Sequence, residues 1–247
     1  MFVGHSAAAG VGDRLVLGYH AVSDVDASTL TVRRSELRRH VAALLNRGYV
    51  GTTFNRAVLE PNGEHRLAVT FDDGDPSVLE HAYPVMSELG VPGTVFVATG
   101  TVGAPGVLGW DELRLLANVG WEIGSHTVTH ACLTEVDDGA LNEELRASRE
   151  LIEAQLDTQC LSIAYPYGEW DERVRAAAGR TGYTAACTTG GARRGDALCW
   201  PRVGIDGRDG LVVTRLKTSR LGRSLRGTPL RALFDRAGRI VRRVRPR

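Results

Sequence analysis

The sequence predicts a parallel α/β barrel, and three observations support this fold class. Strand-like and helix-like segments alternate along the chain, and the helix-like ones are about 10 to 15 residues long, as in βαβ units. The chain has 247 residues, a length at which α/β barrels form single domains. We count six or seven strand–helix units, which favours a closed or nearly closed barrel over an open sheet.

Short apolar runs mark the expected strands. They lie at 14–20, 67–73, 93–99, 121–126, 161–166, 183–189 and 197–205. The expected helices carry apolar residues at helical spacing. They lie at 35–49, 76–90, 110–120, 137–156 and 170–182. The first of these helices begins with Ser35 as its N-cap, and Gly48 lies near its end.

The C-terminus differs from the rest of the chain in charge. Residues 211–247 hold 12 of the 30 Lys and Arg residues but only one of the 29 acids, Asp235, which leaves 18 basic and 28 acidic side chains in the first 210 residues. Apolar residues also recur between the arginines at helical spacing. They are Leu230, Leu233, Phe234, Ala237, Ile240, Val241 and Val244. We therefore expect a barrel domain over 1–210 and a basic amphipathic extension over 211–247.

The basic extension indicates an anionic partner. Two interpretations stay open: a last helix that packs on the barrel, or a peripheral helix that binds a membrane surface or a partner protein. Nucleic acid is not expected, because aromatic interleaving and a recognisable module are both missing from the sequence.

The remaining features of the composition predict a cytoplasmic location, with peripheral membrane attachment as the alternative. The first 20 residues lack the basic and apolar regions of a signal peptide, although the true start could include a leader. No run approaches the roughly 18 apolar residues that span a bilayer. The four cysteines form no CxxC pair, so we expect free thiols.

Two adjacent carboxylates, Asp72 and Asp73, end the apolar run LAVTFDD, and Gly74 follows them. An Asp-Gly pair after alternating apolar residues is typical of a β-hairpin turn. However, the segment 76–90 has helical spacing, so no second strand follows. Both carboxylates are therefore expected at the carboxyl end of a strand, where α/β proteins assemble their active sites.

Two histidines, His126 and His130, follow the next strand but one. The β-branched Thr-Val-Thr between them disfavours a helix, so we expect them at a strand end and in the loop beyond it. A pair of surface histidines is the alternative. Together with Asp72 and Asp73 they make the ligand set of a catalytic divalent metal with open coordination positions. The ion would bind one carboxylate, and its charge would keep the other carboxylate ionised.

The motif TFDDG at 70–74, followed about 50 residues later by SHTVTH at 125–130, closely resembles the polysaccharide deacetylase family, also called the NodB homology or carbohydrate esterase 4 family. The resemblance covers about 14–205. It implies a distorted (β/α)7 barrel and a metal-dependent hydrolase that removes acetyl groups from an N-acetylated sugar or polysaccharide.

The resemblance also implies a role for each residue of these two motifs. Asp72 would be the general base, and Asp73, His126 and His130 would bind the metal. Zn²⁺ is the expected ion, although Co²⁺, Ni²⁺ or Fe²⁺ would suit the same ligands.

The family's third motif corresponds to AYPYG at 164–168. Pro166 and Tyr167 match it as substrate-binding residues, and the backbone N–H of Tyr167 would stabilise an oxyanion. Ala164 stands where the family usually has an arginine that orients the base. We expect Arg202 to supply this guanidinium from a later strand, with a structural salt bridge as the alternative.

The last motif of the family, a Leu-x-His that supplies the general acid, has no counterpart, because no histidine follows Arg202. His20, at the end of the first strand, is our candidate for the acid, as in the branch that deacetylates poly-β-1,6-N-acetylglucosamine. A histidine bonded to a loop carbonyl is the alternative. Trp200 is a candidate for stacking on a sugar ring, although tryptophans also serve as packing residues.

Two other functions compete with N-deacetylation. One is a related barrel hydrolase that cleaves a different amide or ester. The other is a catalytically degenerate barrel that binds glycan without turning it over, because the third-motif arginine and the last histidine are missing. The substrate itself would be an N-acetylated glycan or, for a cytoplasmic enzyme, a lipid-linked or nucleotide-linked sugar.

Overall fold

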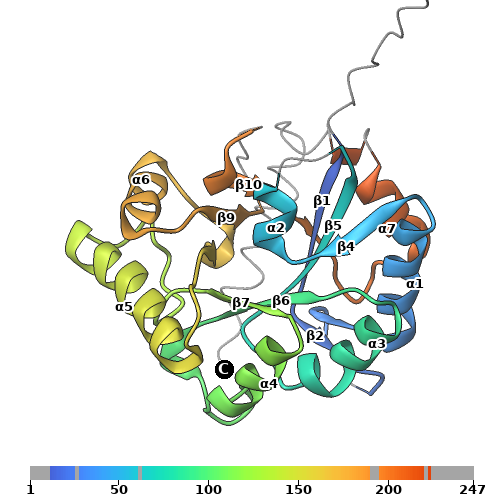
Figure 1. The fold of residues 1–247 in the computed structure, drawn as a ribbon, viewed down its shortest axis with the longest axis horizontal. Helices are drawn as coiled ribbons and strands as arrows, with labels where there is room; N and C mark the ends of the chain where they lie inside the picture. The colour runs from blue at the N-terminus through green and yellow to red at the C-terminus, as the bar shows by residue number, and fades with distance from the viewer. Residues whose placement is uncertain (1–11, 26–27, 61–62, 190–194, 220–221, 224–247) are drawn as a thin grey trace, which may run out of the picture.

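A nearly closed barrel of parallel strands forms the centre of the molecule (Figure 1). The computed structural model describes residues 12–25, 28–60, 63–189, 195–219 and 222–223. Its main sheet has nine strands in the order β10-β9-β8-β7-β6-β5-β1-β11, and β4 pairs with β5 beside this path. The parallel barrel predicted from the sequence is therefore confirmed.

The strands are short, and most of the helices lie around the outside of the barrel (Figure 1). The main-sheet strands are β1 (Arg14–Tyr19), β4 (Tyr49–Thr52), β5 (His65–Asp72), β6 (Gly93–Val97), β7 (Glu122–Ser125), β8 (Ser162–Ala164), β9 (Ala185–Thr188), β10 (Trp200–Pro201) and β11 (Val203–Gly204). A separate pair consists of β2 (Ala21–Val22) and β3 (Thr31–Val32). The helices are α1 (Arg34–Leu45), α2 (Phe54–Leu59), α3 (Tyr83–Glu88), α4 (Trp110–Asn118), α5 (Asp138–Leu156), α6 (Glu172–Thr181) and α7 (Leu211–Thr218).

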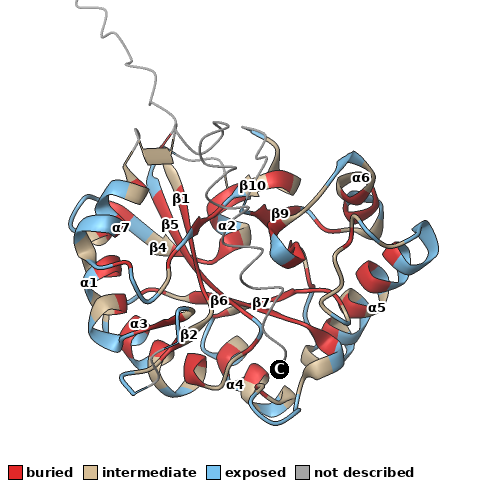
Figure 2. Cartoon of the chain, turned by 180° about the vertical axis from the view of Figure 1, so that it is seen from behind, coloured by how far each residue is buried: buried red, intermediate tan, exposed pale blue. Residues whose placement is uncertain are grey.

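Side-chain alternation along the strands separates the barrel interior from the layer under the helices. In β5, Leu67, Val69 and Phe71 belong to the large cluster that packs against the outer helices, whereas Ala68 belongs to the interior cluster. Thr70 and Asp72 continue the row of Ala68. Figure 2 shows β5 almost wholly in the colour of buried residues. The period of two therefore points Asp72 into the barrel.

Helix α2 closes the barrel interior at the amino ends of the strands. Phe54 of α2 packs edge-on against Phe96 of β6, with 5.7 Å between the ring centroids. The Cζ atom of Arg202 also lies 5.7 Å from the centroid of the Phe96 ring. An apolar plug thus supports a buried cation at the level where the strands end.

Arg202 lies at the seam where the barrel closes. The residues before it form β10, which pairs with β9, and the residues after it form β11, which pairs with β1. The N–H of Arg202 donates to the carbonyl of Thr188 at 2.8 Å, and the N–H of Ile205 donates to Gly18 at 2.9 Å. One short segment therefore joins the two edges of the sheet and carries the guanidinium with it.

Several elements differ from the sequence prediction. The expected strand at 197–205 begins with a 3₁₀ turn, Ala197–Cys199, and divides at Arg202 into β10 and β11. The expected helix at 76–90 begins with a π-helical turn, Val78–Ala82, before α3. We did not predict α2, β2 and β3, which occupy stretches between the expected elements, or β4, which begins at the last residue of the helix expected at 35–49.

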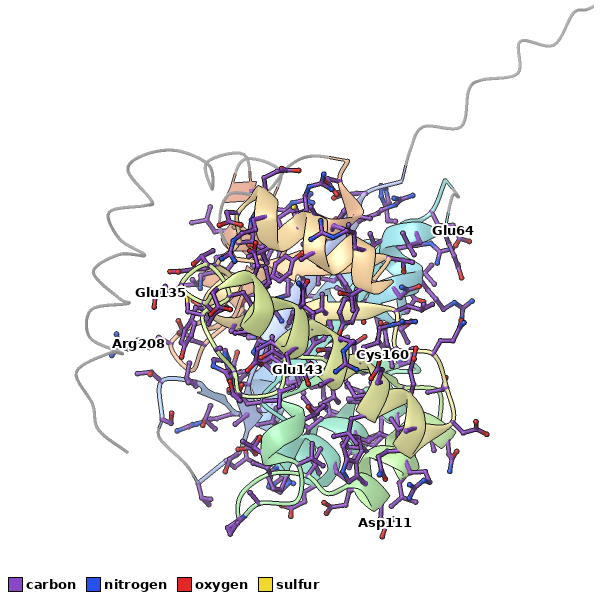
Figure 3. All side chains as sticks on the ribbon, turned by 90° about the vertical axis from the view of Figure 1, so that its left-hand side faces the viewer. Glu64, Asp111, Glu135, Glu143, Cys160 and Arg208 are labelled. Atoms are coloured by element: carbon purple, nitrogen blue, oxygen red, sulfur yellow. The ribbon has the colours of Figure 1, made fainter. Side chains whose placement is uncertain are left out.

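Helix α5 is the longest in the described chain and packs against β7. Cys160, labelled in Figure 3, lies against this helix: its N–H donates to Glu153 Oε1 at 3.0 Å, and its carbonyl accepts from Arg149 Nε at 3.1 Å. All four cysteines are free, as predicted. No helix in the described ranges combines the length and apolar content needed to cross a bilayer.

The predicted C-terminal extension begins with a helix that contacts the barrel layer. Helix α7 starts at Leu211 and packs on α1. Arg223, farther along, pairs with Asp13 just before β1. The amphipathic pattern at 230–244 lies outside the described residues, and the boundary at 210 stays a prediction.

Candidate active site

Three of the predicted metal ligands converge at the carboxyl end of the barrel. Asp73 follows β5 directly, His126 follows β7, and His130 lies in the loop beyond. Asp73 Oδ1 is 3.6 Å from His126 Nε2 and 3.6 Å from His130 Nε2. One ligand atom from each residue lies within 4.8 Å of the other two, with no other such cluster of three or more among the residues described.

The spacing and the donor types fit a divalent transition metal. Zinc bonds of about 2.0–2.2 Å in a tetrahedral arrangement place ligand atoms about 3.4 Å apart. The observed separations of 3.6 Å are close to this value. One carboxylate and two imidazoles would also leave coordination positions for water and substrate.

The orientation of His126 leaves its outer nitrogen available for a metal. Its Nδ1 lies 2.6 Å from the carbonyl oxygen of Ala164, and a carbonyl can only accept, so Nδ1 carries the proton. Burial lowers the pKa of His126, an effect that the nearby Asp72 and Asp73 carboxylates oppose without cancelling. The neutral imidazole therefore presents the Nε2 lone pair to Asp73, in the arrangement that metal-binding histidines adopt.

Backbone strain is concentrated at this site. Five non-glycine residues in the described chain have positive φ, and four of them lie here: Asp73 (70°), Thr127 (70°), His130 (62°) and Tyr167 (60°). Each such residue costs about 1–3 kcal/mol and persists only where the surroundings hold it. Asp73 and Gly74 both have the positive φ of a type I′ turn, so the Asp-Gly hairpin signal was locally correct although a helical turn follows.

Glu144 of α5 holds the strained loop that carries His130. Its Oε2 accepts from the N–H groups of Val128 and Thr129 at 2.8 and 2.9 Å, and its Oε1 accepts from Thr129 Oγ1 at 2.6 Å. Within the loop, Thr127 Oγ1 accepts from the N–H of His130 at 3.0 Å. A buried carboxylate thus satisfies three donors of one turn and fixes the direction of His130.

Asp72 and Arg202 form a buried, two-pronged ion pair beside the three-residue cluster. Arg202 Nη1 donates to Asp72 Oδ1 at 2.6 Å, and Nη2 donates to Oδ2 at 2.7 Å. Nη1 also donates to Thr70 Oγ1 at 3.2 Å. Both partners are only 4% exposed. Such a pair fixes the orientation of the carboxylate as well as its charge.

The electrostatics of Asp72 keep it ionised. Burial alone raises its pKa, but the charge and the hydrogen bonds of Arg202 oppose burial, and the pKa of Asp72 lies below its ordinary value. The same pairing raises the pKa of Arg202 despite its burial. The carboxylate is therefore charged at neutral pH although almost no water reaches it.

His20 shares the electrostatic environment of the site. It directly follows β1 and is half-buried. Burial lowers the pKa of His20, and the charges of Asp72 and Asp73 partly offset this effect. The first strand thus brings the candidate acid to the carboxylates, 52 residues away in the sequence.

The third-motif segment lies beside His130. The ring of Tyr167 meets that of His130 edge-on, with centroids 4.8 Å apart, and the tyrosine is 57% exposed. Pro166 is buried and opens the 3₁₀ turn Pro166–Gly168 that sets the positive φ of Tyr167. No described residue accepts a hydrogen bond from the N–H of Tyr167.

Trp200 is not brought together with these residues. Its ring packs on the interior cluster and lies 6.0 Å from the Cζ of Arg14, the first residue of β1. This contact is at the amino end of the barrel, away from Asp73. Packing therefore accounts for its position, and its role in substrate binding stays a prediction.

Comparisons with known proteins agree with this geometry. The family described as "Polysaccharide deacetylase" matches residues 60–186, just over half of the chain and a range that includes Asp72, Asp73, His126 and His130. The chain belongs to the polysaccharide deacetylase family. His20 and Arg202 lie outside the matched range.

Two curated relatives extend the match to individual polysaccharide deacetylases. YxkH of Bacillus subtilis, named as a polysaccharide deacetylase, is 30% identical over 179 residues, which cover 70% of this chain and 63% of YxkH. The poly-β-1,6-N-acetyl-D-glucosamine N-deacetylase of Staphylococcus aureus is 28% identical over 114 residues, which cover 40% and 39% of the two chains. The match thus spans less than two thirds of either relative.

Solved structures of polysaccharide deacetylases have the same fold. A polysaccharide deacetylase from Bacillus cereus superposes with a TM-score of 0.73 at 25% identity, over 83% of this chain and 68% of its own. The deacetylase PplD of Streptococcus pyogenes, in complex with acetate, gives a TM-score of 0.75 at 21% identity, over 83% and 97%. The distorted (β/α)7 barrel is therefore the fold of this chain.

Proposed function

We propose that this protein is a metal-dependent N-deacetylase that releases acetate from an N-acetylated glycan. One observation carries the proposal: a three-residue ligand cluster lies directly beside a buried, ionised carboxylate at the carboxyl end of the barrel. Membership of the polysaccharide deacetylase family supports the reaction class.

Asp73, His126 and His130 would hold the metal, for which Zn²⁺ is our first candidate. An ion at this site supplies Lewis acidity, which acidifies water and polarises the acetamide carbonyl. The chain contributes the fixed geometry of the ligands, because Ala164 orients His126 and Glu144 holds the loop of His130.

Asp72 would remove the proton from the attacking water. Its lowered pKa means that it is free of a proton before reaction, and Arg202 holds both of its oxygens in place. A weak base of this kind needs an acidified water, which is consistent with a metal-dependent reaction. Arg202 would be a positioning residue that also balances the charge of the base.

His20 and Tyr167 would complete the reaction. The lowered pKa of His20 makes its protonated imidazole a stronger acid, which suits proton donation to the departing amine. The N–H of Tyr167 would donate to the oxyanion that forms from the carbonyl. The exposed ring of Tyr167 lies beside His130, where a sugar could stack on it.

We infer that the substrate is a glycan with N-acetylglucosamine units. The S. aureus relative is named for poly-β-1,6-N-acetyl-D-glucosamine, which supports this class. A lipid-linked or nucleotide-linked N-acetyl sugar is the corresponding substrate if the protein works in the cytoplasm, which is the location that we propose from the sequence.

A combined measurement tests the proposal. Purified protein is analysed for metal and assayed for acetate release from β-1,6-linked and β-1,4-linked N-acetylglucosamine oligomers, with Asp73→Asn as the variant that lacks one ligand. We expect bound metal and acetate release from one of the linkages, and the loss of both in D73N. Bound metal without acetate release from any oligomer would instead indicate a glycan-binding barrel or a different amide as substrate.

A further inference from the structure

Helix α7 turns threonines towards the protein and aliphatic side chains towards solvent. Val212, Val213 and Leu216 are 80%, 41% and 65% exposed. Leu216 lies four positions after Val212 and three after Val213, and both spacings bring side chains to the same helix face, so the three form one stripe. The buried residues of α7 are Thr214 and Thr218. This pattern is the reverse of that of a helix whose apolar face packs on a core.

The hydroxyl groups of the buried threonines both have hydrogen-bond partners, which fix the face that α7 turns towards the barrel. Thr214 Oγ1 lies 3.1 Å from Nε2 of His40 in α1, and Thr218 Oγ1 donates to the carbonyl of Thr214 at 2.8 Å. Lys217 pairs with Asp209 at the start of the helix. Figure 1 shows α7 on the outside of the molecule next to α1. The apolar stripe therefore faces away from the barrel.

The sequence that contains this stripe is basic. Arg215 is exposed between Val213 and Leu216. Residues 211–247 carry 12 basic side chains and one acid, whereas the first 210 residues carry 18 basic and 28 acidic ones. The sequence that follows α7 continues the combination of aliphatic residues and arginines. Apolar surface and clustered positive charge are the two signals that together bind a protein to an anionic bilayer.

We propose that the apolar stripe of α7 (Val212, Val213 and Leu216), together with the basic C-terminal segment, docks on the surface of an anionic phospholipid bilayer. The aliphatic side chains enter the boundary between headgroups and acyl chains, and the arginines contact the lipid phosphates. The acidic barrel is repelled by the same surface, so the protein attaches by its C-terminal side.

Charge complementarity favours lipid over the other occupants of such a face. A second copy would place one strongly basic segment against another, and like charges in contact oppose association. The chain's own C-terminal segment would bring further arginines onto Arg215. An anionic surface removes both repulsions. The proposal is independent of the catalytic assignment, since none of these residues belongs to the site.

Vesicle partitioning of the full-length protein tests the proposal. Flotation is measured with vesicles of phosphatidylcholine alone and of phosphatidylcholine mixed with phosphatidylglycerol. The test variant is Val212→Ser with Leu216→Ser. Its matched control is Leu115→Ser with Val119→Ser, which removes another aliphatic pair at the same spacing, 58% and 52% exposed, at α4. A second variant, Arg239→Gln with Arg242→Gln and Arg243→Gln, changes the charge and leaves α7 intact.

We expect the protein to bind the mixed vesicles, to bind phosphatidylcholine at least about tenfold more weakly, and to lose binding at high salt. V212S/L216S should reduce the partition coefficient by about tenfold or more, the arginine variant should also reduce it, and L115S/V119S should not. Equal binding to both vesicle types would overturn the proposal. So would unchanged binding of V212S/L216S, or a change from dimer to monomer in this variant, which would assign the stripe to a protein interface.

Discussion

Asp72 and Glu122 are two carboxylates inside the same barrel, at opposite ends, and their surroundings have opposite effects. Asp72 ends β5 and meets the guanidinium of Arg202, which keeps its pKa low. Glu122 begins β7 and accepts from Ser162 Oγ, from Thr94 Oγ1 at 3.3 Å and from the N–H of Asn55 at 2.9 Å. These neutral donors lower the pKa of Glu122 but do not cancel the effect of burial, so its pKa is raised.

The difference supports our proposal that the carboxyl end of the barrel is catalytic and the amino end is structural. At the amino end, Glu122 binds the first turn of α2 and so helps to hold the plug that closes the barrel. At the carboxyl end, Asp72 is charged, oriented by a cation and adjacent to a ligand cluster. Four other residues of this site also have strained backbones. A fixed charge and stored strain mark the functional end.

The largest expected effect comes from exchanging each acid for its amide. Asp72→Asn should lower kcat/KM for acetate release by about a thousandfold, because the base is lost. It should also destabilise the fold by about 3 kcal/mol, because Arg202 stays buried without its counter-charge. Glu122→Gln should leave turnover unchanged and lower stability by about 1 kcal/mol or less, because an amide can still bond its hydroxyl neighbours. Acetate-release assays and denaturant melts of both variants check this prediction. Equal turnover in D72N and E122Q would contradict the assignment of catalysis to the carboxyl end of the barrel.

Replacing His20 tests whether this residue, which directly follows β1, takes part in catalysis. His20→Asn should reduce turnover by about 100-fold or more while the protein still binds metal, since the departing amine loses its proton donor. Metal analysis and acetate release measured on the same sample separate the two effects. Near wild-type turnover in H20N would assign the histidine a structural role.

The next effect concerns the strained loop of His130. Glu144→Ala should weaken metal binding by about 10-fold to 100-fold, because the three donors of the turn lose their acceptor. Glu144→Gln should recover most of the affinity, since an amide oxygen accepts from both N–H groups. Calorimetric zinc titration measures this, with Glu143→Ala, an exposed neighbour on the same helix, as control. Equal zinc affinity in E144A and wild type would show that the loop of His130 keeps its conformation without Glu144.

The smallest effect is expected for a carboxylate outside the barrel. Hydrogen bonds from Arg223 and Tyr49 overcome burial and lower the pKa of Asp13 from 3.8 to about 2. A lowered pKa contributes stability that is present above the unfolded value and is lost as pH falls through the folded value. Asp13→Asn should therefore cost about 1–2 kcal/mol at neutral pH and only about 0.4 kcal/mol near pH 2, where folded Asp13 is half protonated.

Denaturant melts across this pH range measure the contribution of Asp13. Asp111→Asn, at a side chain that is 98% exposed, serves as control and should match wild type throughout. A stability difference between D13N and wild type that persists undiminished at pH 2 would contradict the assignment.

Periodicity predicted most of the fold because the outer helices and barrel strands each bury one defined face. Helix α2 escaped prediction for a physical reason: it has only six residues, too few for a helical period to stand out, although Phe54, Ala57 and Val58 fill the barrel interior. Strand β4 begins at Tyr49, which continues the apolar spacing of the helix before it. The strand around Arg202 divides because it must pair with β9 on one side and with β1 on the other.

The ligand cluster could be predicted because its motifs are short and local, whereas its supports could not. Glu144 looks like any acid on an amphipathic helix until the fold brings it to Thr129, 15 residues away. The pairing of Asp72 with Arg202 spans 130 residues, and only the family resemblance suggested it. The acceptor of His126 is a backbone carbonyl, which carries no sequence signal.

Chelation followed by metal return tests the central claim most directly. Acetate release from N-acetylglucosamine oligomers is measured on the protein before chelation, after removal of bound metal, and after addition of Zn²⁺. Our account predicts that activity is lost with the metal and restored by Zn²⁺ in wild type but not in D73N. Undiminished acetate release from metal-free protein would contradict it.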